Sequence, residues 1–362
     1  MQILKLLFIF LFFSCFPTKE ALSIPNISLP PGFKISVFAE VPDARSLTKG
    51  PDGVLFVGTR ESKGSVYLVS YKKGEEKAQN VKEVAKNLNA PNGVAFRDGN
   101  LYVGEIEKIL LFPQIMEKTV APTALAIQLP NETHHGYRYL KFSPNGELIV
   151  AIGSPCNVCD KGGDFGKIFA VDIKSGKKRM IAQGIRNSVG FDFHPTTKEL
   201  WFTDNGRDWL GDDSPPDELN RLEKEGSHFG FPHCHGKNLV DTEFGVPNGC
   251  KDFVPPAREL GAHVASLGMV FYTGNNFPPE YKNQIFIAEH GSWNRKVPQG
   301  YRVTMVKLSG NEAVDYSVFA EGWLSKDFKK LGRPVDLLVL EDGSLIVSDD
   351  FAGLLYRITY SK

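Results

Sequence analysis

The chain has 362 residues, which is long for one ordinary domain but suits a single large β domain. Glycine (35 residues) and proline (23 residues) are abundant, and aromatic residues make up 11% of the chain. Lysine plus arginine and aspartate plus glutamate both number 42, so the formal net charge is zero. A neutral chain has no electrostatic footprint for nucleic acid or for a polybasic membrane surface. We therefore expect no nucleic-acid partner.

The first residues predict an export signal over residues 1–23. The apolar run Leu6–Phe13 is too short to span a bilayer and is typical of a signal-peptide core. Ala21-Leu22-Ser23 resembles a small-x-small cleavage site, whereas Phe12-Phe13-Ser14-Cys15 resembles a relaxed bacterial lipobox. We favour the lipobox because Cys15 directly follows the apolar run. The protein is then expected to be exported, either periplasmic or held at the membrane only through a lipid anchor on Cys15.

One pattern recurs six times between Lys49 and the final strand: an apolar strand, a tight turn, a second apolar strand, a polar loop and a third strand. The turns lie near residues 52, 98, 145, 197, 283 and 342. Most intervals are about 45–60 residues, which fits four-stranded blades. The longer interval between 197 and 283 holds an inserted loop. The repeat predicts an all-β fold, a six-bladed β-propeller over residues 29–362.

The cysteines other than Cys15 predict a disulfide framework. There are four of them, and an even number in an exported chain favours disulfides over metal thiolates. Three pairings are possible, and we favour the local one, Cys156–Cys159 with Cys234–Cys250, in which each bond staples a long loop. A zinc site built from these thiolates and a neighbouring histidine is the alternative.

The stretch from Gly184 to Asn220 carries the densest polar chemistry. Arg186-Asn187 precedes one strand, and after the next strand the chain continues as Asp204-Asn-Gly-Arg-Asp208, followed by further carboxylates up to Glu218. A glycine at a strand end lets backbone carbonyls turn inward, and carboxylates are hard oxygen donors, a combination that suits Ca²⁺. The arginine–asparagine pair on the same unit could meet an anionic organic ligand beside the metal. The other interpretation is a polar surface loop.

In a propeller, the loops that enter and leave the inner strands meet at one end of the central channel, so polar residues far apart in sequence are expected to group there. The residues in such loops are Asn92, His134, His135, Arg186, Asn187, the run Asn205-Gly206-Arg207, the run from Glu289 to Arg295, and Arg333. A ring that holds histidine, several arginines and a Ca²⁺-type loop predicts an active site.

At these residues the chain resembles the soluble quinoprotein glucose/sorbosone dehydrogenases, and within them the sorbosone-dehydrogenase-like branch. The resemblance begins near Leu29 and extends to the final strand. It is carried by GIRN (184–187), TDNGRDWLGDDSPPDELNR (203–221), AEHGSWNR (288–295) and GRPVD (332–336). It implies a propeller enzyme that oxidises an aldose-type sugar or sugar aldehyde at the anomeric carbon. The hydride would pass to pyrroloquinoline quinone (PQQ) with the help of Ca²⁺, and the electron acceptor that follows is unknown.

The resemblance also implies a role for each matched residue. His135 would be the general base, and Arg186 would hydrogen-bond the quinone oxygen on which negative charge develops. The residues expected to bind the cofactor are Asn92, Arg186, Asn187, Arg295 and Arg333. The residues expected at metal ions are Gly206 and Arg207, through their backbone carbonyls, together with Asp217 and Glu218 beside them or at a structural Ca²⁺.

Three positions depart from the glucose-oxidising members. His134 replaces the carboxylate that precedes the base, Val335 replaces a second arginine, and Gly291 lies where a lysine is expected, with Arg295 close by. Because of these departures, the sequence does not specify which sugar is oxidised or which group orients the expected base. Two other classes are compatible with the sequence: a Ca²⁺-dependent, lactonase-like propeller hydrolase, and a non-catalytic propeller that binds a glycan or a partner. Arg186, Arg295 and Arg333 argue against the hydrolase, which would need no cluster of arginines.

Overall fold

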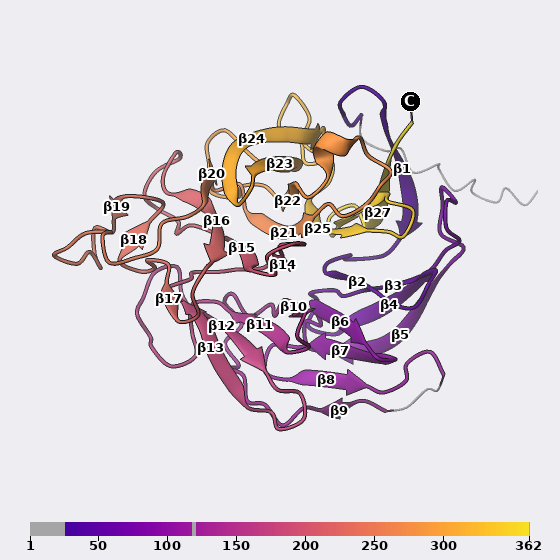
Figure 1. Ribbon diagram of the computed structural model, residues 1–362, viewed down its shortest axis with the longest axis horizontal. Coiled ribbons are helices and arrows are strands. Elements are labelled where there is room, and N and C mark those ends of the chain that lie inside the picture. Colours follow the sequence, from indigo (N-terminus) through magenta and orange to yellow (C-terminus); the bar gives the residue numbers. More distant parts are fainter. Residues whose placement is uncertain (1–25, 118–120, 362) are drawn as a thin grey trace, which may run out of the picture.

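The computed structural model describes residues 26–117 and 121–361. Six antiparallel sheets surround a central axis and form a six-bladed β-propeller (Figure 1). The predicted fold is therefore confirmed. The predicted export signal lies outside the described residues. Across the two described ranges, no helix has the length and apolar character to cross a membrane.

The strands follow the repeat in chain order. Blade 1 contains β2 (Leu47–Lys49), β3 (Val54–Val57), β4 (Gly64–Ser70) and β5 (Asn80–Leu88); blade 2 contains β6 (Gly93–Arg97), β7 (Asn100–Gly104), β8 (Ile109–Phe112) and β9 (Thr123–Ala124). Blade 3 contains β10 (Leu140–Phe142), β11 (Leu148–Ile152), β12 (Lys167–Val171) and β13 (Lys178–Gln183), with β17 (Ser227–His228) added in parallel at its outer edge. Blade 4 contains β14 (Phe191–Phe193), β15 (Leu200–Asp204), β16 (Pro216–Leu222) and β20 (Arg258–Ala262).

Blade 5 contains β21 (Ser266–Phe271), β22 (Ile285–Glu289), β23 (Arg302–Ser309) and β24 (Glu312–Glu321), with the short 3₁₀ helix η1 (Pro279–Tyr281) between its first two strands. Blade 6 contains β25 (Pro334–Val339), β26 (Leu345–Asp349) and β27 (Leu354–Tyr360), and its outer strand is β1 (Phe33–Glu40). β1 pairs antiparallel with β27, from Phe33 opposite Tyr360 to Glu40 opposite Leu354. The ring is thus closed by strands from both ends of the chain.

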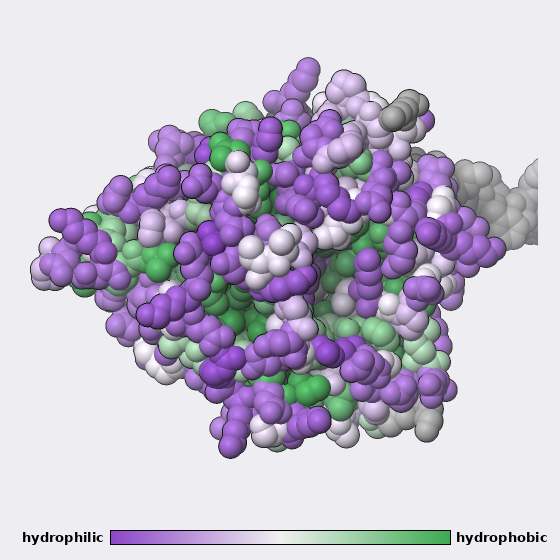
Figure 2. Space-filling model, viewed as in Figure 1, coloured by the Kyte–Doolittle hydropathy of each residue, from purple (hydrophilic) through white to green (hydrophobic). Residues whose placement is uncertain are grey.

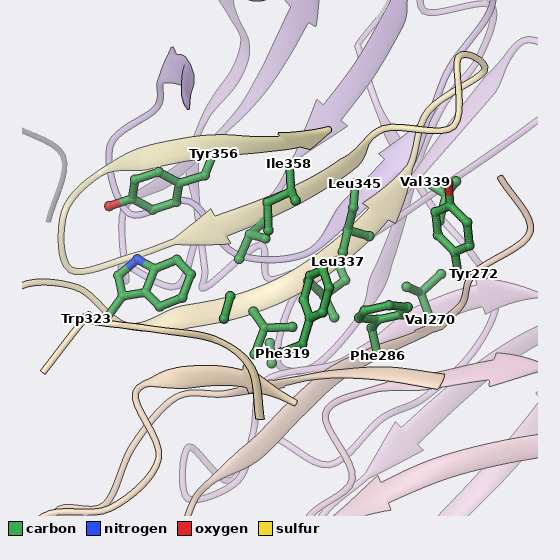
Figure 3. Packing of buried hydrophobic residues seen from close by; sticks show 14 of the residues in the cluster. Val270, Tyr272, Phe286, Phe319, Trp323, Leu337, Val339, Leu345, Tyr356 and Ile358 are labelled. Atoms are coloured by element: carbon green, nitrogen blue, oxygen red, sulfur yellow. The ribbon is translucent and has the colours of Figure 1, made fainter. Parts of the chain in front are cut away.

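The hydrophobic core is divided into clusters that lie between neighbouring blades. Figure 3 shows the cluster between blades 5 and 6, where Phe286 and Phe319 pack near Leu337 and Leu345. Every residue of β22 is buried, because blades cover both faces of each inner strand. Each large side chain buried there stabilises the fold by roughly 1.5–3 kcal/mol. The blades therefore act as a rigid frame for the loops at the end of the channel.

Two disulfides stabilise irregular segments of the chain. Cys156–Cys159 closes a short loop after β11, and Cys234–Cys250 closes the insertion between β16 and β20, so the predicted pairing is confirmed. The insertion also holds the hairpin of β18 (Cys234–His235) and β19 (Leu239–Val240), which projects at the left of Figure 1. The face shown in Figure 2 is largely hydrophilic, with hydrophobic side chains visible in the hollows.

Candidate active site

The loops that enter the first strand or leave the second strand of several blades enclose a cavity of about 410 Å³. The residues predicted from sequence that line it are His134, His135, Arg186, Asn187, Asn205, Gly206, Asp217, His290, Gly291, Trp293, Asn294 and Arg333. The predicted residues that are not among its lining are Asn92, Arg207, Glu218, Glu289, Ser292 and Arg295. The structure therefore brings together the expected base, the arginine beside it and part of the expected metal loop.

His135 is held in one orientation at the end of blade 3. Its Nδ1 lies 2.8 Å from the carbonyl oxygen of Ser154. Because a carbonyl only accepts hydrogen bonds, Nδ1 carries the proton and Nε2 is the basic nitrogen. A Cβ at position 153 would lie 2.6 Å from the His135 Cβ, so Gly153 is what allows the imidazole to pack there. The group that orients His135 is therefore the backbone carbonyl of Ser154.

Two further features of His135 suit a general base. Its φ is +51°, a backbone conformation that costs a non-glycine residue free energy and that is concentrated at functional sites. Burial, helped by the positive charge of Arg186 and by His134, lowers the pKa of His135 well below its usual value. The imidazole is therefore neutral at neutral pH and can accept a proton.

Arg186 is buried, and its guanidinium is fixed by the loop that the Cys156–Cys159 disulfide closes. Its Nε donates to the carbonyl of Asn157 (2.8 Å) and its Nη2 to Oδ1 of Asn157 (2.9 Å). Nη2 also lies 3.3 Å from Oδ2 of Asp208, whose backbone N–H donates to the same Asn157 Oδ1 at 2.8 Å. Asn157 therefore locks the guanidinium plane and the Asp208 loop together.

Three buried carboxylates surround Gly206 beside Arg186. Burial raises the pKa of Asp204 to about 7, of Asp217 to about 6 and of Glu218 to about 8, the last also through repulsion from Asp204. Asp204 and Glu218 line a separate hollow of about 10 Å³, together with Gly206. A hollow of this size holds roughly one water molecule or ion. A bound cation would stabilise the ionised form of these carboxyls and so lower their pKa values.

A cation at this corner would need backbone oxygens in its coordination shell. In residues 26–117 and 121–361, no three His, Cys, Asp or Glu side chains are grouped so that they could hold a metal ion. Gly206 itself has no room for a side chain, because a Cβ there would lie 2.8 Å from the carbonyl oxygen of Pro216. The chain is thus in close backbone contact at the position where the sequence predicts carbonyl ligands.

Blades 1 and 6 place three arginines on the other side of the cavity. Arg45 lies 2.9 Å and Arg60 3.5 Å from the buried carboxylate of Asp350, which also contacts His290 at 2.9 Å. Arg333 donates to the backbone carbonyls of His290 (3.0 Å) and Gly291 (2.9 Å), both of which are uncharged acceptors. The cavity lining as a whole contains four arginines and two aspartates, which favours an anionic ligand.

The predicted residues outside the lining have other contacts. Asn92 is fully buried and accepts a hydrogen bond from Nε of Arg45 (3.0 Å), so it supports a lining arginine from behind. Arg207 forms an ion pair with Asp241 (2.6 Å). Arg295 pairs with Asp213 (3.0 Å) and also donates to the Asp212 carbonyl, so its guanidinium is held by the blade 4 loop outside the cavity lining.

Several lining residues were not singled out from the sequence. They are Arg45, Arg60, Tyr137 and His263. Arg45 lies in the loop entering β2, as Arg333 lies in the loop entering β25, and Arg60 follows β3 as Asn205 follows β15. Position within the repeat could therefore have identified both arginines. Val335, expected as a lost anion contact, is buried in an apolar cluster below the cavity.

The sequence and the fold match known proteins over almost the whole chain. A family model described as TrAA12-like matches residues 27–361. An uncharacterized protein of Borreliella burgdorferi is 39% identical over 356 residues, covering 93% of this chain and 92% of that protein. A pyrroloquinoline quinone-dependent sugar dehydrogenase of Hypocrea jecorina is 26% identical over 258 residues, covering 57% of this chain and 58% of that protein.

Solved structures agree at the level of the fold. A Trichoderma reesei enzyme of family AA12 superposes with a TM-score of 0.79 at 20% identity, covering 95% of this chain and 100% of that chain. The PQQ domain of a Coprinopsis cinerea pyranose dehydrogenase superposes with a TM-score of 0.77 at 19% identity, covering 92% of this chain and 97% of that one. Together with the sequence matches, these results confirm the resemblance to PQQ-dependent sugar dehydrogenases.

Proposed function

The chain belongs to the TrAA12-like family, and on that premise we propose that it is an exported PQQ-dependent dehydrogenase that oxidises an aldose-type sugar or sugar aldehyde at the anomeric carbon. The names of the Hypocrea jecorina and Coprinopsis cinerea relatives support the cofactor and the substrate class. When bound, PQQ supplies the hydride acceptor. The residues of this chain bind the cofactor, orient the sugar and move the proton.

The observation that carries the proposal is the geometry of His135. With Nδ1–H donated to Ser154, the unprotonated Nε2 is the nitrogen that can take the proton of the anomeric hydroxyl. The lowered pKa keeps it free of a proton at neutral pH. The buried guanidinium of Arg186 lines the same cavity, where a fixed positive charge stabilises the negative charge that develops on the acceptor oxygen.

The cofactor fits the charge of the cavity. PQQ carries carboxylates, and planar guanidinium groups bind carboxylates with two parallel hydrogen bonds. Arg333 is available for this role because its hydrogen bonds go to neutral carbonyls and its guanidinium otherwise lies over the Tyr301 ring. Arg60 is partly exposed, although it also pairs with Asp43 and Asp350. Arg45, held by Asn92, adds a third positive charge. Asn187, which lines the cavity next to Arg186, would hold the edge of the ring system.

Ca²⁺ fits the opposite corner by the chemistry of its donors. The backbone carbonyls of Gly206 and Arg207 and the carboxylates of Asp217 and Glu218 are the hard oxygen ligands that Ca²⁺ prefers. The raised pKa values of Asp217 and Glu218 are what a buried acidic site has when no cation balances it. A bound cation would polarise the same acceptor oxygen that Arg186 faces.

Reconstitution tests the proposal. The metal-stripped protein is titrated with PQQ by absorbance, with and without Ca²⁺, and dye reduction is then measured with a panel of aldoses. We expect activity only with both additions. An absence of PQQ binding by the wild-type protein would refute the proposal, and Ca²⁺-dependent hydrolysis of lactones instead would support the hydrolase.

Two variants separate chemistry from binding. His135→Ala should keep PQQ affinity and lower turnover by roughly 10²–10⁴-fold, the usual contribution of a positioned general base. Arg186→Ala should lower both affinity and turnover, because it removes a contact as well as a charge that stabilises the transition state. Normal turnover by the His135→Ala protein would show that this imidazole is not the base.

A further inference from the structure

Two exposed tryptophans stand at the rim of the cavity. Trp209 is 66% exposed and Trp293 is 64% exposed, whereas Trp201 and Trp323 are completely buried. Their ring centroids are 5.4 Å apart and the ring planes are nearly perpendicular, at 89°. Trp293 also lines the cavity. An exposed aromatic surface continuous with a binding cavity is a marker of a ligand-binding surface.

The loops that carry these two rings are clamped to each other. Trp209 follows β15 in blade 4 and Trp293 follows β22 in blade 5. Asn294 donates to Asp208 Oδ1 (2.8 Å), Arg295 pairs with Asp213, and the backbone N–H of Lys296 donates to Asp212 Oδ2 (3.1 Å). The rings are therefore presented in a fixed arrangement, so a ligand that stacks on them has little conformational entropy to remove.

The backbone of Trp209 adds a second observation. Its φ is +72°, in the left-handed region, which is unfavourable for a large side chain. Strain of this kind costs roughly 1–3 kcal/mol and persists where the surrounding contacts impose it. Burial does not offset it here, because most of the indole faces solvent. The contacts of the clamped loops impose this conformation, which is of a kind concentrated at functional sites.

The chemistry of the pair fits a sugar ring. A pyranose has an apolar face of C–H groups, which packs on an aromatic ring, and an edge of hydroxyl groups, which needs polar partners. Asp212, Asp213 and Lys296 supply polar groups in the two loops, and the Arg295–Asp213 pair leaves the rim without a strong surplus of one charge. A cavity of about 410 Å³ lies in the lower part of the usual range for ligand sites, so a sugar longer than one ring would extend toward the rim.

We propose that Trp209 and Trp293 form a saccharide subsite next to the catalytic cavity. The preferred substrate is then an oligosaccharide that is oxidised at its reducing end, rather than a free monosaccharide. The sugar ring to be oxidised lies in the cavity, and the ring attached to it stacks on the tryptophans. This inference deepens the proposed function and rests on it for the identity of the reaction. The subsite itself rests on the position of the two rings.

Steady-state kinetics with matched substrates test the subsite. Each aldose that the reconstituted enzyme oxidises is compared with the disaccharide and trisaccharide that carry it at the reducing end. We expect KM to be roughly 3- to 10-fold lower for the longer sugars, the contribution of one stacking contact. Trp209→Ala should remove this advantage and leave the kcat/KM of the monosaccharide unchanged, and Trp209→Phe should restore part of it. Phe328→Ala, at an exposed aromatic outside the cavity lining, is the control.

A binding measurement keeps the subsite separate from the reaction. Titration of the protein with the same oligosaccharides should quench tryptophan fluorescence in the wild type and much less in Trp209→Ala, with or without PQQ. Quenching in a protein that lacks dehydrogenase activity would refute the proposed function and support the subsite. Equal KM values for short and long sugars in an active enzyme would refute the subsite alone. Slower reduction of a protein electron acceptor by Trp209→Ala, with unchanged sugar kinetics, would assign the pair to that acceptor and also refute it.

Discussion

The two sides of the cavity hold opposite charge. On the side of blades 1 and 6, Arg45 and Arg60 share the buried carboxylate of Asp350, and Arg333 donates to the backbone carbonyls of His290 and Gly291. On the side of blade 4, several carboxylates lie around Gly206 and Arg186 is the cation that faces them. Blade 4 is opposite blade 1 in a ring of six blades. One cavity is thus prepared for an anion on one side and for a cation on the other.

The pKa values of the buried carboxyls follow the same division. Burial alone would raise the pKa of Asp350, but His290 and Arg45 hold it well below its usual range. In the blade 4 corner burial raises the pKa of Asp204 to about 7, against the backbone hydrogen bonds from Asn187 and Arg186 that lower it. The comparison shows that the pKa of a buried carboxyl depends on the balance between burial and its partners. The charged partners win at Asp350, and burial wins at Asp204.

Removing a positive charge should weaken cofactor binding most. Arg333→Ala should raise the Kd for PQQ by roughly 10- to 100-fold, because it removes a charge-assisted contact from a partly buried site. Absorbance titration measures the change. Arg295→Ala is the matched control, since Arg295 has the same chemistry but pairs with Asp213 outside the cavity lining. An equal loss of PQQ affinity in both variants would contradict the assignment of the anion-binding side to blades 1 and 6.

Loosening the support of Arg186 should have a smaller effect. Asn157→Ala removes the contacts at 2.9 Å to the guanidinium and at 2.8 Å to the Asp208 backbone. We expect kcat to fall roughly 10-fold with little change in KM, because the orientation of the charge matters most in the transition state. Asn157→Asp, which keeps an acceptor at this atom, should recover part of the activity. A KM effect alone would assign Asn157 to sugar binding.

Calcium should stabilise the protein, and more so at higher pH. The carboxyls of Asp204, Asp217 and Glu218 have pKa values of about 7, 6 and 8 in the folded chain, above their unfolded values. The metal-free protein therefore loses stability as the pH rises from about 4 to 8, because the unfolded chain is the one that ionises readily. Ca²⁺ favours the ionised form and offsets this loss.

Thermal unfolding with and without Ca²⁺ measures this effect. The rise in Tm on adding saturating Ca²⁺ should be roughly 3–8 °C at pH 8 and should shrink toward pH 5. Glu218→Gln should reduce both the rise and its pH dependence. A Tm shift that is the same at pH 5 and pH 8 would show that these carboxyls do not contact the ion.

The smallest effect is expected on the pH profile. Burial, Arg186 and His134 lower the pKa of His135, so the acidic limb of kcat should lie below pH 6.5, and activity should fall only when the imidazole is protonated. His134→Ala removes one of the groups that lower the pKa of His135 and should move this limb to higher pH. A limb that moves to lower pH would contradict the assignment of His135.

The fold could be predicted because its signals are local. A turn such as Asn145-Gly146 between two apolar runs specifies a hairpin without reference to the rest of the chain, and six such units specify the ring. Cys156–Cys159 could be paired for the same reason. The roles expected for His135 and Arg186 came from the resemblance to a known family, because no local pattern contains them.

The remainder of the site depends on contacts between distant loops. Arg295 points to Asp213 because of a contact across two blades, and nothing in the sequence around it specifies that direction. The orienting partner of His135 is the carbonyl of Ser154, and a backbone group leaves no signature in a list of side chains. Arg45 could have been found only by comparing the same loop in every repeat.

The closing strand has a consequence for how the protein is made. Among the described residues β1 is the first strand to be synthesised, yet its partner β27 is the last. Until the C-terminus has arrived, the sixth blade presents an unpaired edge, and open edges recruit other chains. A chain that stops short of β27 would leave both β1 and β26 without a pairing partner, so an incomplete copy exposes two strand edges that the complete chain pairs.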